Sequence, residues 1–206
     1  MAITTYAELK SAVADFLNRD DLTSTIDTFI DMAEANLNRD VRHWRMEQRS
    51  EAEIDDQYLT LPTDWVETIR LTVKDTVPYA MNLVSRDRMQ DIRFQGDDVS
   101  GKPVYYAHIA GEIEMYPTPD ATYDIELLYT QKIEALSDSN TSNWLLAEAP
   151  DLYLYAVLLE TAIYLRDDER ITAYAGMYQS KLAALNTSGN KATVSGTGLK
   201  LNIRSY

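Results

Sequence analysis

The distribution of apolar and polar residues divides the chain into three stretches with different periods. From Tyr6 to Leu17 apolar residues recur every three or four positions, and Thr5 and Glu8 have the spacing of a capping box. This pattern predicts a helix that ends near Asn18 and has one apolar face, made of Tyr6, Leu9, Val13, Phe16 and Leu17.

A second helical pattern begins at residues 24–27 and is predicted to run to about Trp44. Its apolar face comprises Ile26, Phe29, Ile30, Ala33, Leu37 and Val41. Because the connection between the two helices is short, we expect them to form an antiparallel hairpin.

The period changes to two between about Ser50 and Ile133, which predicts short strands. Residues 52–54 and 58–61 flank residues 55–57, a polar turn, and are expected to form a hairpin. Further strands are predicted at 69–73, 79–84, 103–109, 112–116 and 123–131, with a short helix at 85–92 and a helical turn beginning at residues 62–65. The short connections favour antiparallel pairing.

Helical periodicity returns after the polar linker 134–143. Pro150 occupies a first-turn position, and residues 151–166 are apolar nearly all round except at Glu160, which is typical of a central, buried helix. A last helix is predicted from residue 167 to Leu185, with a stripe of Ile171, Tyr174, Ala175, Tyr178, Leu182 and Leu185. Residues 186–206 contain three basic residues and no acidic residue, and they are predicted to form a flexible arm.

The predicted fold class is therefore α+β. It is mainly a helical bundle of two N-terminal and two C-terminal helices, with a small antiparallel β-rich insertion and an extended C-terminal arm. We assign the bundle to residues 1–49 and 144–185, the insertion with its linker to 50–143, and the arm to 186–206.

Composition narrows the functional classes. The 206 residues include no cysteine, which excludes disulfides and thiolate chemistry, and the net charge of −14 disfavours binding to a phosphate backbone. The N-terminus lacks the pattern of a signal peptide, and the longest apolar run, residues 152–159, is far shorter than the roughly 20 residues of a spanning helix. We expect a protein that is soluble and intracellular at synthesis, contacts no membrane and has protein partners.

Catalytic, cofactor-binding and metal-binding patterns are absent from the sequence. His43 and His108 lack the spacing of metal ligands, which favours surface or hydrogen-bonded histidines. The acidic pairs at 20–21, 55–56, 97–98 and 167–168 could serve a carboxylate-dependent hydrolase, but each lies at a predicted turn or helix start, where aspartate is common. Glu160 is expected to pair with an arginine or to lie at a subunit interface. We therefore predict that the protein is not an enzyme and has no cofactor.

Three further features indicate protein interfaces. Four arginines would share one helix face if the second helix continued far enough: Arg39, Arg42, Arg45 and Arg49. Acidic residues are interleaved with them, which favours a salt-bridged surface or a subunit interface over a nucleic-acid-binding stripe. The chain also contains 14 tyrosines, a residue type that is enriched at protein–protein interfaces. The arm alternates apolar residues, so it can add a strand to a partner or thread into a groove.

The chain resembles the head–tail adaptor proteins of tailed bacteriophages. The resemblance lies in residues 4–19 and 33–39, in Leu61–Trp65, and in Gly101–Tyr106 followed by Tyr116–Asp120. It continues in residues 136–146, 149–155 and 164–169, and it is weakest at 76–99 and in the last twenty residues.

This resemblance implies a structural protein of the virion that is made in the host cytoplasm. Such adaptors form a homo-oligomeric ring under the portal protein, commonly a dodecamer, which extends the DNA channel and attaches the tail tube or nozzle protein. DNA passes through without specific binding, and an acidic wall fits that role. The family often clasps the portal with a C-terminal extension, which makes the arm the expected portal-binding segment, through Lys191, Leu199, Lys200, Leu201, Ile203, Arg204 and Tyr206. The alternatives are tail-tube completion and, more remotely, a cell-wall hydrolase.

Overall fold

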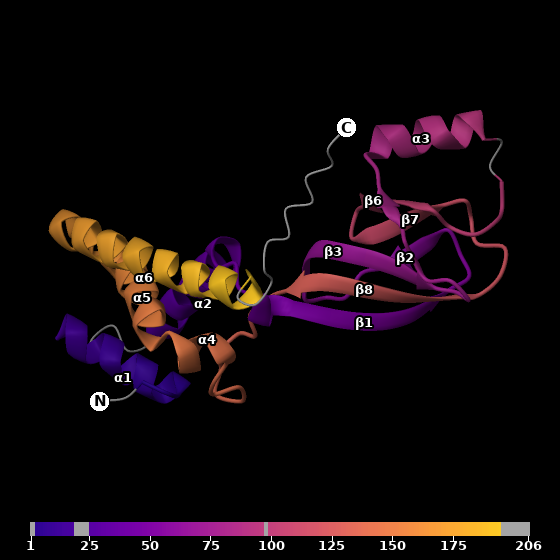
Figure 1. Ribbon diagram of the computed structural model, residues 1–206. Coiled ribbons are helices and arrows are strands. Elements are labelled where there is room, and N and C mark those ends of the chain that lie inside the picture. Colours follow the sequence, from indigo (N-terminus) through magenta and orange to yellow (C-terminus); the bar gives the residue numbers. More distant parts are fainter. Residues whose placement is uncertain (1–2, 19–24, 97–98, 195–206) are drawn as a thin grey trace, which may run out of the picture. The chain divides into compact units, whose positions relative to one another are not determined.

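The computed structural model describes residues 3–18, 25–96 and 99–194 (Figure 1). Within these residues the fold is α+β, as predicted, with six α-helices and two four-stranded sheets. The chain separates into two compact units, which we call the helical unit (residues 1–46 and 133–206) and the β unit (residues 47–132).

The helical unit is organised around one apolar helix. Its elements are α1 (Tyr6–Leu17), α2 (Ile26–Asp40), the 3-10 helix η1 (Trp44–Met46), α4 (Trp144–Glu148), α5 (Pro150–Leu165) and α6 (Asp168–Val194). Helix α5 contacts α1, α2, α4 and α6, and its side chains at Leu152, Tyr153 and Val157 are fully buried. The central position predicted from its all-round apolar pattern is confirmed.

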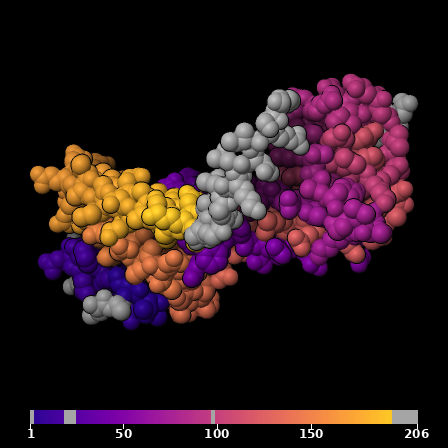
Figure 2. Space-filling view, viewed as in Figure 1, coloured from indigo at the N-terminus to yellow at the C-terminus, as the bar shows by residue number. Residues whose placement is uncertain are grey.

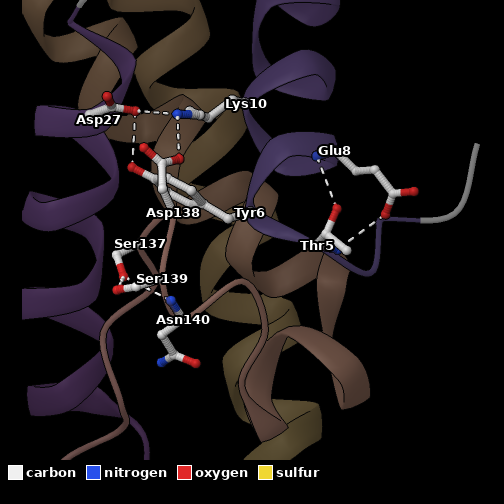
Figure 3. A network of polar contacts seen from close by, with 9 residues as sticks. All are labelled: Thr5, Tyr6, Glu8, Lys10, Asp27, Ser137, Asp138, Ser139 and Asn140. Atoms are coloured by element: carbon white, nitrogen blue, oxygen red, sulfur yellow. Dashed lines mark hydrogen bonds and ion pairs between the residues drawn. The ribbon is translucent and has the colours of Figure 1, made fainter.

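Helix α1 begins at the predicted capping box and is fastened to α2 by a polar network (Figure 3). The Tyr6 hydroxyl donates to Asp27 Oδ1 at 2.9 Å, and the Lys10 ammonium lies 3.1 Å from the same carboxylate. Burial, followed by the hydrogen bond to Asp27, raises the pKa of Tyr6, so the phenol stays protonated. Phe16, predicted on the apolar face, is 54% exposed; Ala12 is buried instead.

The capping box gives a first test of local structure. Thr5→Ala removes the side-chain acceptor of the Glu8 amide, so the free energy of unfolding should fall by about 1 kcal/mol. Chemical denaturation measures this change, and Thr172→Ala, an exposed position within α6, serves as the control. An equal effect in the two variants would contradict a capping role.

Two helix ends differ from the sequence prediction. Helix α2 ends at Asp40 rather than near Trp44, because Asn186 of α6 accepts a hydrogen bond from the Arg42 amide at 2.9 Å and donates to the Asp40 carbonyl. Helix α6 continues to Val194, so residues 186–194, predicted as part of the arm, are helical. The remaining arm residues, 195–206, lie outside the described part of the chain.

The β unit contains two sheets with one shared core. The first has the order β1 (Glu47–Ile54), β8 (Tyr123–Gln131), β3 (Trp65–Lys74), β4 (Tyr79–Ala80). The second has the order β2 (Tyr58–Thr60), β7 (Glu112–Tyr116), β6 (Tyr105–Ile109), β5 (Asn82–Leu83). Leu71 and Ile125 of the first sheet pack with Ile113 and Met115 of the second. Helix α3 (Arg86–Gln95) packs against β6, and Ser85, where the helix was predicted to begin, is its N-cap residue.

The predicted hairpin of residues 52–54 and 58–61 is wrong. Strands β1 and β2 lie in different sheets, and residues 55–57 carry the chain from one to the other. Strand β1 pairs instead with β8, from Glu47 opposite Thr130 to Ile54 opposite Tyr123. Pairing is antiparallel throughout these sheets except between β5 and β6. Residues 62–65 form a turn that leads directly into β3 rather than a helical turn.

Candidate interaction surfaces

An apolar groove lies between α2 and α5 on the helical unit. It has a volume of about 330 Å³ and is lined by Thr25, Thr28, Phe29, Met32, Glu160, Ile163 and Tyr164. Met32, Ile163 and Tyr164 are each at least half exposed, at 52%, 50% and 59%. Contiguous apolar surface of this kind marks interaction sites in soluble proteins. We call this surface the α2/α5 groove.

The groove follows from the composition of α5. This helix is apolar around its circumference, and its neighbours cover only part of it; α6, in yellow and orange, covers one side of the helical unit in Figure 2. The ring of Phe29 lies 5.2 Å from that of Tyr164, which forms the outer wall. The Asn36 amide donates to Glu160 at 2.6 Å, so within the described residues this carboxylate pairs with an amide, and the arginine partner that the sequence offered as one possibility is not found there.

The β unit has a second exposed aromatic surface, the α3 pocket. Its volume is about 440 Å³, and it is lined by Gln57, Tyr58, Gln90, Arg93, Phe94, Ile109 and Glu114. Phe94 on α3 is 85% exposed. The pocket contains a shielded ion pair, in which Arg93 Nε donates to Glu114 Oε1 at 2.7 Å and the Arg93 side chain also donates to the Met115 carbonyl.

His43 is buried between aromatic rings in the helical unit. It stacks on Trp144 with ring centroids 5.2 Å apart, and a Cβ atom placed on Gly189 of α6 would lie 2.6 Å from its Cδ2 atom. Its Nδ1 accepts from the Arg45 amide, as expected of a hydrogen-bonded histidine. Burial lowers the pKa of His43, and the charge of Arg45 adds to this, although Glu148 opposes it.

The lowered pKa predicts a dependence of stability on pH. The folded state binds a proton on His43 less tightly than the unfolded state does. The contribution of neutral His43 to the free energy of unfolding is therefore complete above the unfolded pKa of about 6.5 and is lost as the pH falls below that value. We expect the difference in unfolding free energy between wild type and His43→Phe to shrink between pH 7.5 and pH 5.5. Denaturant titrations at both pH values measure it, and a constant difference would contradict the prediction.

The four arginines singled out in the sequence do not share a helix face. Arg39 lies on α2, Arg42 follows the end of that helix, Arg45 lies in η1 and Arg49 lies in β1. Their contacts are also separate: Arg42 donates to the Val41 carbonyl, and Arg45 lies 3.1 Å from Glu148. The single stripe therefore does not exist, because α2 ends before it could form.

The family model described as SU10 adaptor protein matches residues 4–198. The chain belongs to this family of phage head–tail adaptors. No curated protein matches the chain. The family resemblance predicted from the sequence is thus confirmed, and it implies a structural, non-enzymatic role for the adaptor within the virion.

The acidic pairs of the adaptor have local structural roles where they are described. Asp56 accepts a hydrogen bond from the adjacent Gln57 amide, and Asp167 accepts one from the Arg170 amide at the start of α6. The pairs at 20–21 and 97–98 lie outside the described residues. In the described ranges, no three His, Cys, Asp or Glu side chains are arranged to hold a metal ion, and no helix has the length and apolarity to span a membrane.

Most buried polar groups of the adaptor hold its own core together. Glu34 accepts hydrogen bonds from the Tyr153 hydroxyl and the Leu136 amide, which fastens residues 133–143 against α2 and α5. Burial raises the pKa of Glu34. Tyr106, Tyr153 and Tyr178 are also core residues, so much of the tyrosine content reflects packing rather than interfaces. His108 is half-buried, and within the described chain its Nδ1 atom is buried without a hydrogen-bond partner.

Of the predicted portal-binding residues, only Lys191 lies in the part of the chain that the structure describes. Lys191 is exposed on α6. The others lie outside the described residues: Leu199, Lys200, Leu201, Ile203, Arg204 and Tyr206. The sequence did not identify the α2/α5 groove, although Met32 carries a signal for it, since this large apolar residue falls outside the stripe of α2.

Proposed function

We propose that the adaptor forms a homo-oligomeric ring that docks under the portal protein, extends the DNA channel and provides the attachment surface for the tail. The family match over residues 4–198 carries this proposal. The net charge of −14 supports the channel role, because an acidic wall repels DNA phosphates and lets the duplex slide without adhering.

The α2/α5 groove supports lateral contact between copies in such a ring. A ring needs an interface in which two different surfaces of one chain meet head to tail. The exposed apolar side chains of the groove are suited to the buried centre of an interface, where charged residues are depleted. We therefore place part of the subunit contact at Met32, Ile163 and Tyr164.

A charged residue in the groove should abolish the ring and leave the chain folded. Met32→Asp and Tyr164→Asp introduce a carboxylate that would have to be buried without a partner in the interface. Phe16→Asp is the matched control, since Phe16 has almost the same exposure as Met32 and lies on α1, outside the groove. Negative-stain images of adaptor–portal complexes would reveal the loss, and circular dichroism would check the fold. A ring that survives both groove substitutions would contradict this placement.

The decisive experiment co-expresses the adaptor with the portal protein from its own genome and images the product by electron microscopy. We expect a second ring stacked on the portal. A bare portal would refute the proposal, and binding to a tail protein without the portal would favour tail-tube completion. Lytic activity on peptidoglycan would be needed to revive the hydrolase alternative.

A further inference from the structure

Strand β1 presents a long, regular edge. It lies at the end of its sheet, and among the described residues it pairs only with β8 (Figure 1). Its eight residues pair with β8 without a register shift, and Glu47–Ile54 contains neither proline nor glycine. A strand of this kind has a row of unsatisfied amide and carbonyl groups along its outer side, which can pair with another strand.

The side chains of β1 differ on its two faces. Glu47, Arg49, Glu51 and Glu53 alternate along one face, and all four are exposed. On the other face, burial increases along the strand through Ser50 and Ala52 to Ile54, which belongs to the core. An added strand should therefore be basic on one face and apolar on the other. Glu51 also pairs with Lys74 inside the β unit, so Glu47 and Glu53 contribute most of the negative charge on the exposed face of β1.

The C-terminal arm has this pattern in its sequence. Leu199, Leu201 and Ile203 alternate with Lys200, Asn202 and Arg204. The two basic residues are four positions apart, as are Glu47 and Glu51. In an antiparallel register with Lys200 opposite Glu51, Arg204 falls opposite Glu47 and the apolar residues fall on the core side. Leu201 is then opposite Ser50. Opposite charges in such cross-strand pairs are favourable.

We propose that residues 198–204 of one copy add to β1 of the neighbouring copy as an antiparallel strand and so link successive subunits. The inference rests on the ring of the proposed function. A neighbouring copy is favoured over the portal as the partner because both complementary surfaces belong to this chain, which is what a head-to-tail ring requires. The arm–portal contact expected from the sequence becomes the competing outcome of the test.

The absence of cysteine makes a direct crosslinking test available. Chains carrying only Ser50→Cys are mixed with chains carrying only Leu201→Cys, assembled with the portal protein and oxidised. We expect disulfide-linked dimers, because directly opposite residues in a ladder are close enough for a disulfide. Arg49→Cys replaces Ser50→Cys in the control; its side chain lies on the opposite face, so the dimer band should be lost.

The outcomes separate the proposals. A ring on the portal without dimers above the control overturns the strand exchange and leaves the proposed function standing, whereas a bare portal in the wild-type images overturns both. If the double variant Ser50→Cys/Leu201→Cys crosslinks only within single chains, and the mixture does not crosslink, the arm folds back on its own chain and the proposal fails.

Charge exchange distinguishes the neighbouring copy from the portal. Arg204→Glu and Glu47→Lys should each release adaptor copies from the ring, and the double exchange should restore them, because Glu47 falls opposite Arg204 in this register. Glu53→Lys is the control, because Glu53 falls opposite the uncharged Gly198 in this register. If Arg204→Glu weakens attachment while Glu47→Lys behaves like Glu53→Lys and gives no rescue, the arm binds the portal instead and the proposal is overturned.

Discussion

Replacing Gly189 with alanine is expected to reduce the free energy of unfolding by about 2 kcal/mol, although alanine is the better helix former. The new methyl group would lie 2.6 Å from His43 Cδ2 and 3.2 Å from the Cγ and Nε2 atoms of the same ring. The ring is held by the stack on Trp144, so either the ring or the end of α6 must shift. Denaturant unfolding of the full chain measures the loss.

Gly176→Ala provides the matched control in the same helix. A Cβ atom at Gly176 would meet no atom within 4 Å, so only the helix propensity changes. This variant should gain about 0.5–1 kcal/mol. Opposite signs for the two substitutions would establish that α6 packs against His43 through Gly189, and equal gains would contradict that contact.

The second large effect concerns the ion pair of the α3 pocket. Arg93→Met should destabilise the β unit by about 3–5 kcal/mol, because it leaves the shielded carboxylate of Glu114 without its cation. The side chains of Arg93 and Glu114 are only 15% and 8% exposed, so water replaces little of the lost interaction. The Gln57 amide, which also donates to Glu114, cannot neutralise the charge.

The double variant Arg93→Met/Glu114→Met tests this explanation. Removing both charges eliminates the unpaired carboxylate, so most of the lost stability should return. Chemical denaturation of the two single variants and the double variant completes the cycle. A double variant as unstable as the sum of the singles would mean that packing around Arg93, and not charge pairing, dominates.

Local signals in the sequence were sufficient to predict much of the fold. The capping box at Thr5, the proline at the start of α5 and the all-round apolar pattern of that helix depend on neighbouring residues alone. The predicted hairpin of β1 and β2 was wrong because alternation reveals the faces of a strand and not its partner. The partner of β1 lies 69 to 83 positions later in the chain, in β8.

The candidate surfaces were harder to predict for the same reason. The arginine stripe required α2 to continue, and α2 ends where Asn186, more than 140 residues later in the chain, satisfies its last groups. The groove arises where α2 and α5 fail to cover each other completely. Phe16 and Met32 show that periodicity alone does not predict which apolar side chains are exposed. Phe16 belongs to the apolar stripe of α1 and is exposed, whereas Met32 lies outside the stripe of α2 and lines the groove.

The pairing of Glu47 with Thr130 places the first and last strands of the β unit side by side. The chain therefore enters and leaves this unit through adjacent positions, as in insertions that a host domain tolerates. A phage lineage could exchange the whole β unit for another of different shape by recombination at these two points, without interrupting a helix. The exposed surface of such a unit could then diversify independently of the helices of the other unit.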